Sequence, residues 1–280
     1  MQKIYPLLIM TLFINACTSI KTEPDPEKNN QIELLGDSNS PKRALVIGNS
    51  QYTHQALNNS TNDARDMANN LVDMGFYVTR AIDLDQHKMK GVIDNFREDV
   101  RKIPQSAKQK VALFYFSGHG ARSNQDENYI IPTNNERIKR EHDLRHQAFN
   151  IRTEIKEPME KVNSDGVNII IADACRDNPY EGSGKSLNRG LKRMETSSKS
   201  GGAVIAFAAD EGETADDGDG TNGLYTTYLL KKMRENKNKP IDQVFMDVYD
   251  PVVKESQNQQ HPWYVSTLED EYCLDGCDIN

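Results

Sequence analysis

The alternation of short apolar runs with amphipathic helical segments is the feature that most constrains the fold of this chain. Predicted strands cover residues 43–49, 77–82, 110–116, 167–173, 202–209 and 263–267, and predicted helices cover residues 62–76, 87–103, 151–162, 224–236 and 241–255. Runs this apolar are typical of strands buried on both faces of a sheet. Strands that alternate with helices predict the α/β class: a mostly parallel sheet between two helical layers, which is a three-layer αβα sandwich.

The first 17 residues have the anatomy of an export signal. They place Lys3 before an apolar stretch of about ten residues, too short to span a membrane, and end in small residues before Cys17. The stretch INAC resembles a bacterial lipoprotein signal, which implies lipidation of Cys17 and a membrane anchor. Thr18 after this cysteine implies sorting to the outer membrane, with the domain on its periplasmic face or at the cell surface.

Polar segments frame the predicted domain. Residues 18–41 are predicted to be a flexible tether, and residues 271–280 a short C-terminal tail. The domain between them covers residues 42–270. Inside it, residues 134–147 and 180–201 are charged and predicted to be exposed loops, of which the second is rich in glycine and serine and expected to be protease-sensitive.

The four cysteines divide into a candidate anchor, a pair and a single thiol. Cys17 is the candidate anchor. Cys273 and Cys277 lie four residues apart and are candidates for a disulfide, because an exported chain meets an oxidising compartment. Two thiols without a nearby histidine make a poor zinc site, and the absence of a C-x-x-C motif argues against a redox role. Cys175 has no partner in the sequence, which makes it the cysteine of interest.

Two of the apolar runs end in a reactive side chain. The stretch FYFSGHG (114–120) contains His119, and IIIADACRD (169–177) contains Cys175. Sites in open α/β sheets form beyond the carboxyl ends of the strands, so these side chains face one cleft if their strands are neighbours. An imidazole can activate a thiol or protonate a leaving group. The glycines beside His119 leave room for substrate, and the N–H groups of Gly120 and Cys175 can donate to a developing oxyanion.

Several segments together resemble the caspase-like cysteine peptidases, most closely the metacaspases, the paracaspases and their bacterial relatives. They are KRALVIGNSQY, NDARDMANNLVDMGFYVT, LFYFSGHG, YIIP and IIIADACRDNP, and the resemblance covers residues 42–268. It implies a caspase-like sandwich in which Cys175 is the nucleophile and His119 the general acid/base. No third catalytic residue, metal or organic cofactor is required. The order ACR, with Arg176 after the cysteine, is caspase- and paracaspase-like and departs from the usual metacaspase pattern.

Acidic residues near the predicted site indicate the charge of the substrate. Asp173 lies two residues before Cys175, a spacing that puts both side chains on one face of a strand. Asp63 matches by position an acidic residue of the paracaspase substrate pocket, and Asp216 or Asp217 falls where that pocket takes a third. Carboxylates around a narrow pocket pair well with a planar guanidinium. We therefore expect cleavage after arginine, with lysine as the alternative, and not after aspartate.

The net charge and the composition of the loops limit which other partners we expect for this protein. The net charge of −8 argues against nucleic acid, so we expect a protein or peptide substrate and the membrane as partners. The resemblance also allows a homodimer. The acidic loop 210–223 lacks the spacing of an EF-hand, so no metal site is predicted, while calcium activation, as in some metacaspases, stays open. The basic loop 180–201 is a predicted site of self-cleavage.

Less specific interpretations stay open for each of these features. A lone histidine after a strand is more often structural, and a lone cysteine there is usually a small apolar residue. Asp63 can be a helix-start residue favoured by the helix dipole, and Asp173 a carboxylate bonded to neighbouring N–H groups. The whole domain can also be a non-catalytic interaction or scaffold module that keeps the fold.

Overall fold

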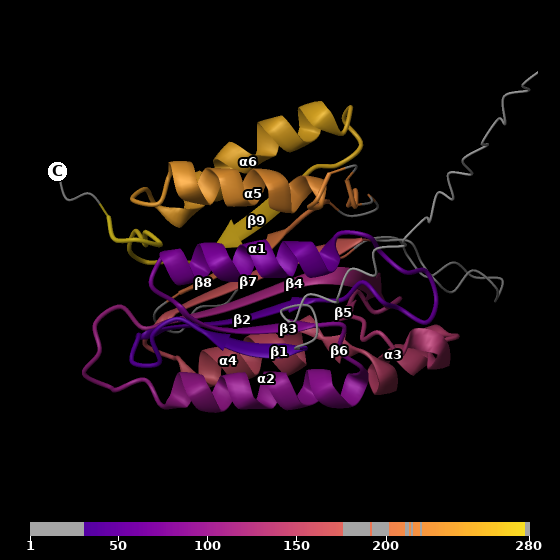
Figure 1. Cartoon of the computed structure of the whole chain (residues 1–280), viewed down its shortest axis with the longest axis horizontal. Coiled ribbons are helices and arrows are strands. Elements are labelled where there is room, and N and C mark those ends of the chain that lie inside the picture. Colours follow the sequence, from indigo (N-terminus) through magenta and orange to yellow (C-terminus); the bar gives the residue numbers. More distant parts are fainter. Residues whose placement is uncertain are drawn as a thin grey trace, which may run out of the picture. The chain divides into compact units, whose positions relative to one another are not determined.

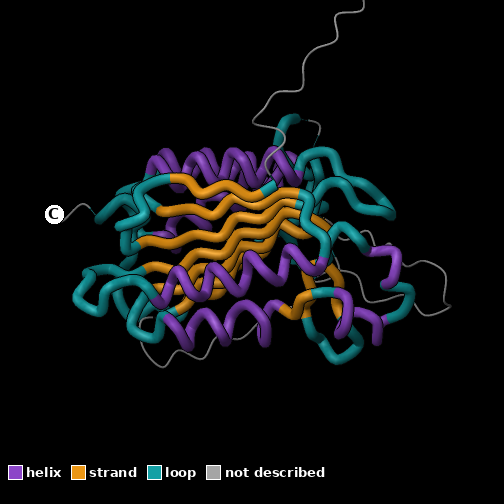
Figure 2. The backbone as a smooth tube through the Cα atoms, turned by 60° about the horizontal axis from the view of Figure 1, so that its bottom comes forward, coloured by secondary structure: helices purple, strands orange, loops and turns teal. Residues whose placement is uncertain are grey.

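Seven strands follow one another across the central sheet of the described chain (Figures 1 and 2). In spatial order they are β1 (Ile32–Leu35), β3 (Tyr77–Ile82), β2 (Lys42–Gly48), β4 (Val111–Arg122), β7 (Val167–Cys175), β8 (Ala203–Phe207) and β9 (Trp263–Ser266). The computed structural model describes residues 31–175, 191, 202–210, 213, 215–218 and 220–277. The five inner strands are parallel and the two edge strands antiparallel, which confirms the predicted mostly parallel sheet.

Helices cover both faces of the sheet (Figure 1). One face carries α1 (Ser60–Asp73), α5 (Leu224–Glu235) and α6 (Ile241–Glu255), and the other carries α2 (Gln86–Arg101), the π-helical turn η3 (Ile151–Lys156) and α4 (Glu157–Val162). Successive side chains of a strand point to opposite faces. On β4, Tyr115 therefore packs with the α1 side while Phe114 and Phe116 pack with the α2 side. Two apolar cores result, and the predicted three-layer sandwich is confirmed.

The segment after the centre of β4 differs from the prediction. β4 continues to Arg122, past the expected strand end, and pairs antiparallel with β5 (Asn128–Ile130), which pairs with β6 (Phe149–Asn150). The expected loop at 134–147 instead holds the 3₁₀ turn η2 (Asn135–Arg137) and the helix α3 (Glu141–Gln147). The prediction of a loop was wrong because Ile138 and Leu144, set among charged residues, are buried in a small apolar cluster under this segment.

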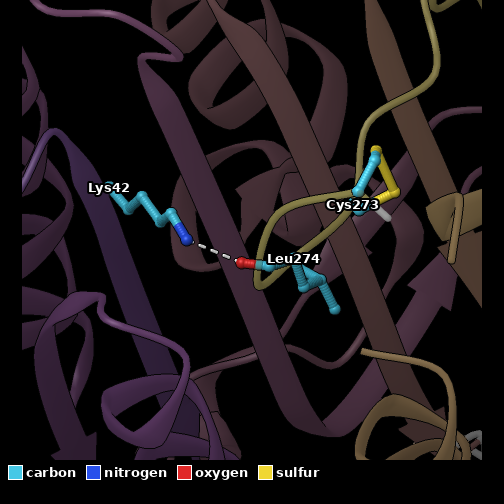
Figure 3. The surroundings of a disulfide bond; sticks show 4 residues. Lys42, Cys273 and Leu274 are labelled. Carbon is cyan, nitrogen blue, oxygen red and sulfur yellow. Dashed lines mark hydrogen bonds between the residues drawn. A yellow bond between two sulfur atoms is a disulfide. The ribbon is translucent and has the colours of Figure 1, made fainter. Parts of the chain in front are cut away.

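The structure also moves both predicted boundaries of the domain outward. Residues 32–35, expected in the tether, form β1 because they pair antiparallel with β3, and Glu33 forms an ion pair with Arg80 across the two strands. At the other end, Leu274 is buried and the sulfurs of Cys273 and Cys277 are joined in a disulfide (Figure 3). The ordered fold therefore includes most of the predicted C-terminal tail.

Within the part of the chain that the structure describes, no helix has the length and apolar character needed to cross a membrane.

Candidate active site

The two residues singled out by the sequence meet at the carboxyl end of the sheet. β4 and β7 are adjacent parallel strands, and their register places His119 opposite Cys175 and Ser117 opposite Asp173. This register follows from the two apolar runs, which pair residue by residue from Val111 onward. The structure describes only the backbone of Cys175. The condition set by the sequence, that the two strands be neighbours, is met.

The environment of His119 fixes its tautomer. The imidazole is buried, and its Nε2 lies 2.6 Å from the main-chain oxygen of Gln55. A carbonyl oxygen only accepts hydrogen bonds, so Nε2 must carry the proton, and Nδ1 is the nitrogen that can take up or release one. Gly120 lies directly beyond the histidine, where a Cβ would come within 2.9 Å of the Ala174 Cβ on β7. Glycine is therefore needed for the two strands to approach here.

Asp63 and Asp173 form a buried carboxylate pair next to this position. Asp63, in the first turn of α1, accepts hydrogen bonds from the Ser117 hydroxyl at 2.8 Å and the Gly223 N–H at 2.9 Å. Asp173, on β7, accepts one from the Thr226 hydroxyl at 2.6 Å. A Cβ on Gly223 would lie 3.3 and 3.4 Å from an oxygen of each carboxylate. The two side chains therefore face the same small space from α1 and β7.

Burial perturbs both carboxyl groups strongly. The pKa of Asp63 is raised to about 6 and the pKa of Asp173 to about 8, mainly by desolvation and in part by the charges of neighbouring carboxylates, including Asp217. Hydrogen bonds oppose this shift only in part. At Asp173, the Thr226 hydroxyl donates a hydrogen bond to the carboxylate. The Tyr115 hydroxyl lies 2.5 Å from the Thr226 hydroxyl and extends this network. Because they are held by neutral donors, these groups suit a positively charged ligand.

The structure separates the two candidates for a third acidic residue. The side chain of Asp216 is exposed, and its carboxylate accepts the N–H of Gly218 within its own loop. Asp217 is half-buried, accepts the N–H of Asn58 at 2.7 Å, and acts on the pKa values of Asp63 and Asp173. The charge of Asp217 therefore acts on the carboxylate pair, whereas Asp216 contributes mainly its backbone.

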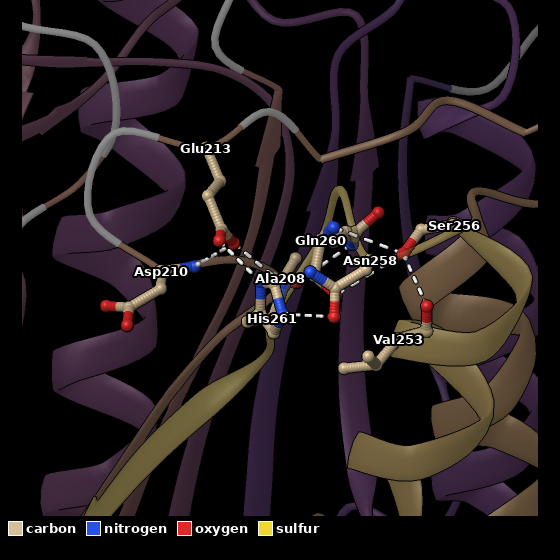
Figure 4. Close-up of polar contacts among 8 residues, drawn as sticks. All are labelled: Ala208, Asp210, Glu213, Val253, Ser256, Asn258, Gln260 and His261. Carbon is tan, nitrogen blue, oxygen red and sulfur yellow. Dashed lines mark hydrogen bonds and ion pairs between the residues drawn. The ribbon is translucent and has the colours of Figure 1, made fainter.

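A polar cluster around Gln260 and His261 lies at the end of β8 and includes Glu213 of the acidic loop (Figure 4). Gln260 is 1 % exposed; its amide nitrogen donates to the Ala208 carbonyl at 2.8 Å and its amide oxygen accepts the Asp216 N–H at 2.9 Å. Glu213 accepts the His261 N–H at 2.8 Å and also contacts the His261 ring. These bonds hold the acidic loop against the sheet, beside the carboxylate pair.

Four residues of this site were not found from the sequence: Gln55, Ser117, Gly223 and Thr226. Gln55 acts through its carbonyl and Gly223 through its N–H and missing side chain, and neither property has a sequence signature. Ser117 lies in the SGHG stretch and two residues before His119, so period-two alternation offered a signal for it.

Other predicted features fall outside the described residues. They include lipidation of Cys17, the side-chain position of Cys175 and almost all of the basic loop 180–201. The acidic loop 210–223 is described in part, and no group of three metal-ligating side chains occurs among the described residues.

The comparison with known families agrees with this geometry. The family model of the caspase domain matches residues 41–273. The chain therefore belongs to the caspase-domain family, and at the level of that family it is a cysteine-type peptidase, a hydrolase that acts on proteins. No curated protein matches the sequence.

Proposed function

We propose that this protein is a cysteine endopeptidase that cleaves protein substrates after arginine or lysine. The observation that carries the proposal is the juxtaposition, within a caspase domain, of the His119–Cys175 register position and the buried pair of Asp63 and Asp173. The first supplies a nucleophile and an acid/base. The second supplies negative charge that a substrate cation can neutralise.

The mechanism is acyl transfer. The Cys175 thiolate attacks the scissile carbonyl carbon, and the oxyanion accepts hydrogen bonds from the N–H groups of Gly120 and Cys175. His119 donates a proton to the leaving amine as the C–N bond breaks, which leaves a thioester. A water molecule then attacks the thioester, gives its proton to His119 and releases the acid product. Because Nε2 is bonded to the Gln55 carbonyl, Nδ1 is the atom that exchanges these protons.

The preference for a basic side chain follows from the charge of the pocket. A guanidinium between Asp63 and Asp173 would form charge-assisted hydrogen bonds and would replace part of the solvation that both carboxylates have lost. Asp217 adds negative charge at the same place. An aspartate side chain would meet only repulsion there, which supports cleavage after basic residues.

The cellular setting is proposed from the sequence. The lipoprotein-like start supports export and anchoring through Cys17, with the outer membrane as the destination. The basic segment 180–201 supports self-processing by an enzyme that cleaves after arginine or lysine. Calcium activation, a homodimer and the metacaspase or paracaspase branch remain predictions.

The proposal is tested with protein that begins after the signal, at residue 18, so that β1 is kept. Fluorogenic peptides that end in arginine, lysine or aspartate are compared, with Cys175→Ala and His119→Ala as inactive controls. We expect cleavage after arginine or lysine that both variants abolish. Cleavage after aspartate would keep the catalytic pair but contradict the acidic pocket. Failure to cleave any peptide, with or without calcium, would favour a non-catalytic scaffold module.

A further inference from the structure

Tyr52 lies in the loop between β2 and α1 and forms hydrogen bonds on both sides of its hydroxyl. Its oxygen accepts the main-chain N–H of His119 at 2.8 Å, and its O–H donates to the carbonyl of Ile131 at 3.0 Å. A hydroxyl has a single hydrogen to donate, so the direction of both bonds is determined. Tyr52 is 6 % exposed, and this polar bridge is therefore made in a largely water-free environment.

The Tyr52 hydroxyl replaces one inter-strand backbone hydrogen bond at the position of His119. The Ile131 N–H donates to the His119 carbonyl at 3.0 Å, as an antiparallel ladder requires. The second hydrogen bond of such a pair would join the His119 N–H to the Ile131 carbonyl. Here the Tyr52 hydroxyl lies between these two groups and bonds to both. The backbone of His119 is thus held at a spacing set by a side chain from another loop.

Gly118 makes room for this hydroxyl. Its φ is +156°, and a Cβ at this position would lie 2.4 Å from the Tyr52 oxygen. Any other residue would have to displace the tyrosine. The glycine before the histidine in the SGHG stretch is therefore explained by Tyr52.

The same loop also holds the imidazole ring. The ring centroids of Tyr52 and His119 are 4.2 Å apart, and three residues further on Gln55 accepts the Nε2 proton. The loop is itself anchored, because the Asp83 carboxylate accepts the N–H groups of Ser50 and Gln51 at 2.8 Å each. Tyr52 therefore connects this anchored loop to both the backbone and the ring of His119.

We propose that Tyr52 is a positioning residue for His119, which fixes the backbone and the ring plane of the histidine so that Nδ1 faces the reacting groups. The inference rests on the proposed function, because it takes His119 as the general acid/base. Tyr52 acts through the histidine, because both hydrogen bonds of its hydroxyl go to the protein backbone.

The first test compares Tyr52→Phe, which keeps the ring and removes the hydroxyl, with Tyr272→Phe, a buried tyrosine in the C-terminal segment near the disulfide. We expect kcat for an arginine peptide to fall by about 10- to 100-fold in Tyr52→Phe, because small misplacements of a catalytic group carry costs of this size. KM should stay within about twofold, since the carboxylate pair is not altered. Tyr272→Phe should leave both constants unchanged. Melting temperatures of both variants show whether they are folded.

A second measurement does not depend on peptidase activity. NMR of protein labelled with ¹⁵N-histidine, assigned with His119→Asn, reports which ring nitrogen carries the proton. We expect the Nε2–H tautomer in the parent protein and in Tyr272→Phe, and a mixture or a shifted titration in Tyr52→Phe. An unchanged kcat together with an unchanged His119 spectrum in Tyr52→Phe would overturn the inference. If the parent protein cleaves nothing, the proposed function fails and the NMR comparison alone decides the role of Tyr52.

Discussion

Charged groups at the two ends of the sheet are stabilised in opposite ways. At the amino end, the half-buried Lys42 donates to the main-chain oxygens of Leu274 (Figure 3) and Met74. The buried Lys110 pairs with Asp165 at 2.5 Å. At the carboxyl end, Asp63 and Asp173 are held by hydroxyl and N–H donors, and no cation among the described residues forms an ion pair with either.

The pKa values follow this difference. The hydrogen bond from Lys110 lowers the pKa of Asp165, whereas burial raises the pKa of Asp63 and Asp173. Removing carboxylates from water without a counter-charge is costly for the free energy of folding. The amino end therefore uses charge to hold the fold together. At the carboxyl end, burial shifts both carboxyl groups toward the neutral form, and a bound substrate cation would favour their charged form.

The largest expected effect comes from removing one charge of the carboxyl-end pair. Asp173→Asn should lower kcat/KM for an arginine peptide by about 100-fold, because loss of one partner of a buried charge pair costs at least 2–3 kcal/mol. Asp165→Asn is the matched change at the amino end and should leave kcat/KM unchanged. Equal losses in the two variants would show that the ends do not differ in function.

The second-largest expected effect is on stability, and it concerns the amino end of the sheet. Replacing Cys273 and Cys277 by serine should lower the free energy of unfolding by about 2 kcal/mol, the value expected for a disulfide that closes so short a loop. Urea unfolding measures the change, with reductant added to the parent protein as a second control. Cleavage of the arginine peptide should be retained, since the disulfide lies at the end of the sheet opposite Cys175. A large loss of kcat/KM without unfolding would contradict this separation.

The third effect is the pH dependence of substrate binding. A cation binds the deprotonated pair, so protons must leave before the substrate enters. With pKa values of about 6 and about 8, KM for an arginine peptide should fall as pH rises between these values. For one displaced proton with a pKa of about 8, the fall in KM between pH 6 and pH 8 is about 50-fold. A peptide with neutral citrulline in place of arginine controls for titration of the catalytic groups. The same slope for both peptides would place the titrating group outside the pocket.

The smallest effect is at Gly223. Its φ of −58° and ψ of 151° are open to alanine, so Gly223→Ala should fold. The new methyl would occupy the space that both carboxylates face and should raise KM for arginine peptides by about tenfold, the cost of one misplaced carbon in a pocket. Gly220→Ala, where a Cβ meets open space in the same loop, is the control. An unchanged KM in Gly223→Ala would show that the basic side chain of the substrate binds elsewhere.

The sequence was most informative where a property is carried by a whole segment. Continuous apolar runs defined the first residue of each inner strand to within one position, and the two runs that end at His119 and Cys175 proved to be neighbours. Asp63 and Asp173 were expected near each other, and the structure places an oxygen of each carboxylate beside Gly223. The sequence was less informative for β1 and α3. β1 is four residues long, and α3 has few apolar residues in a charged stretch, so both depend on the surfaces they contact.

By itself, the sequence determined the α/β layering and predicted the catalytic candidates and the acidic residues Asp63 and Asp173, because apolar periodicity and residue chemistry act locally. Only the tertiary structure decided the tautomer of His119, which depends on the Gln55 carbonyl, and showed that the charge of Asp217 acts on Asp63 and Asp173. It also brought the Tyr52 hydroxyl to the backbone of His119. Each of these depends on atoms from loops that are distant in the chain. Such contacts arise only when the packed sheet brings the loops to one edge and excludes water from the bonds between them.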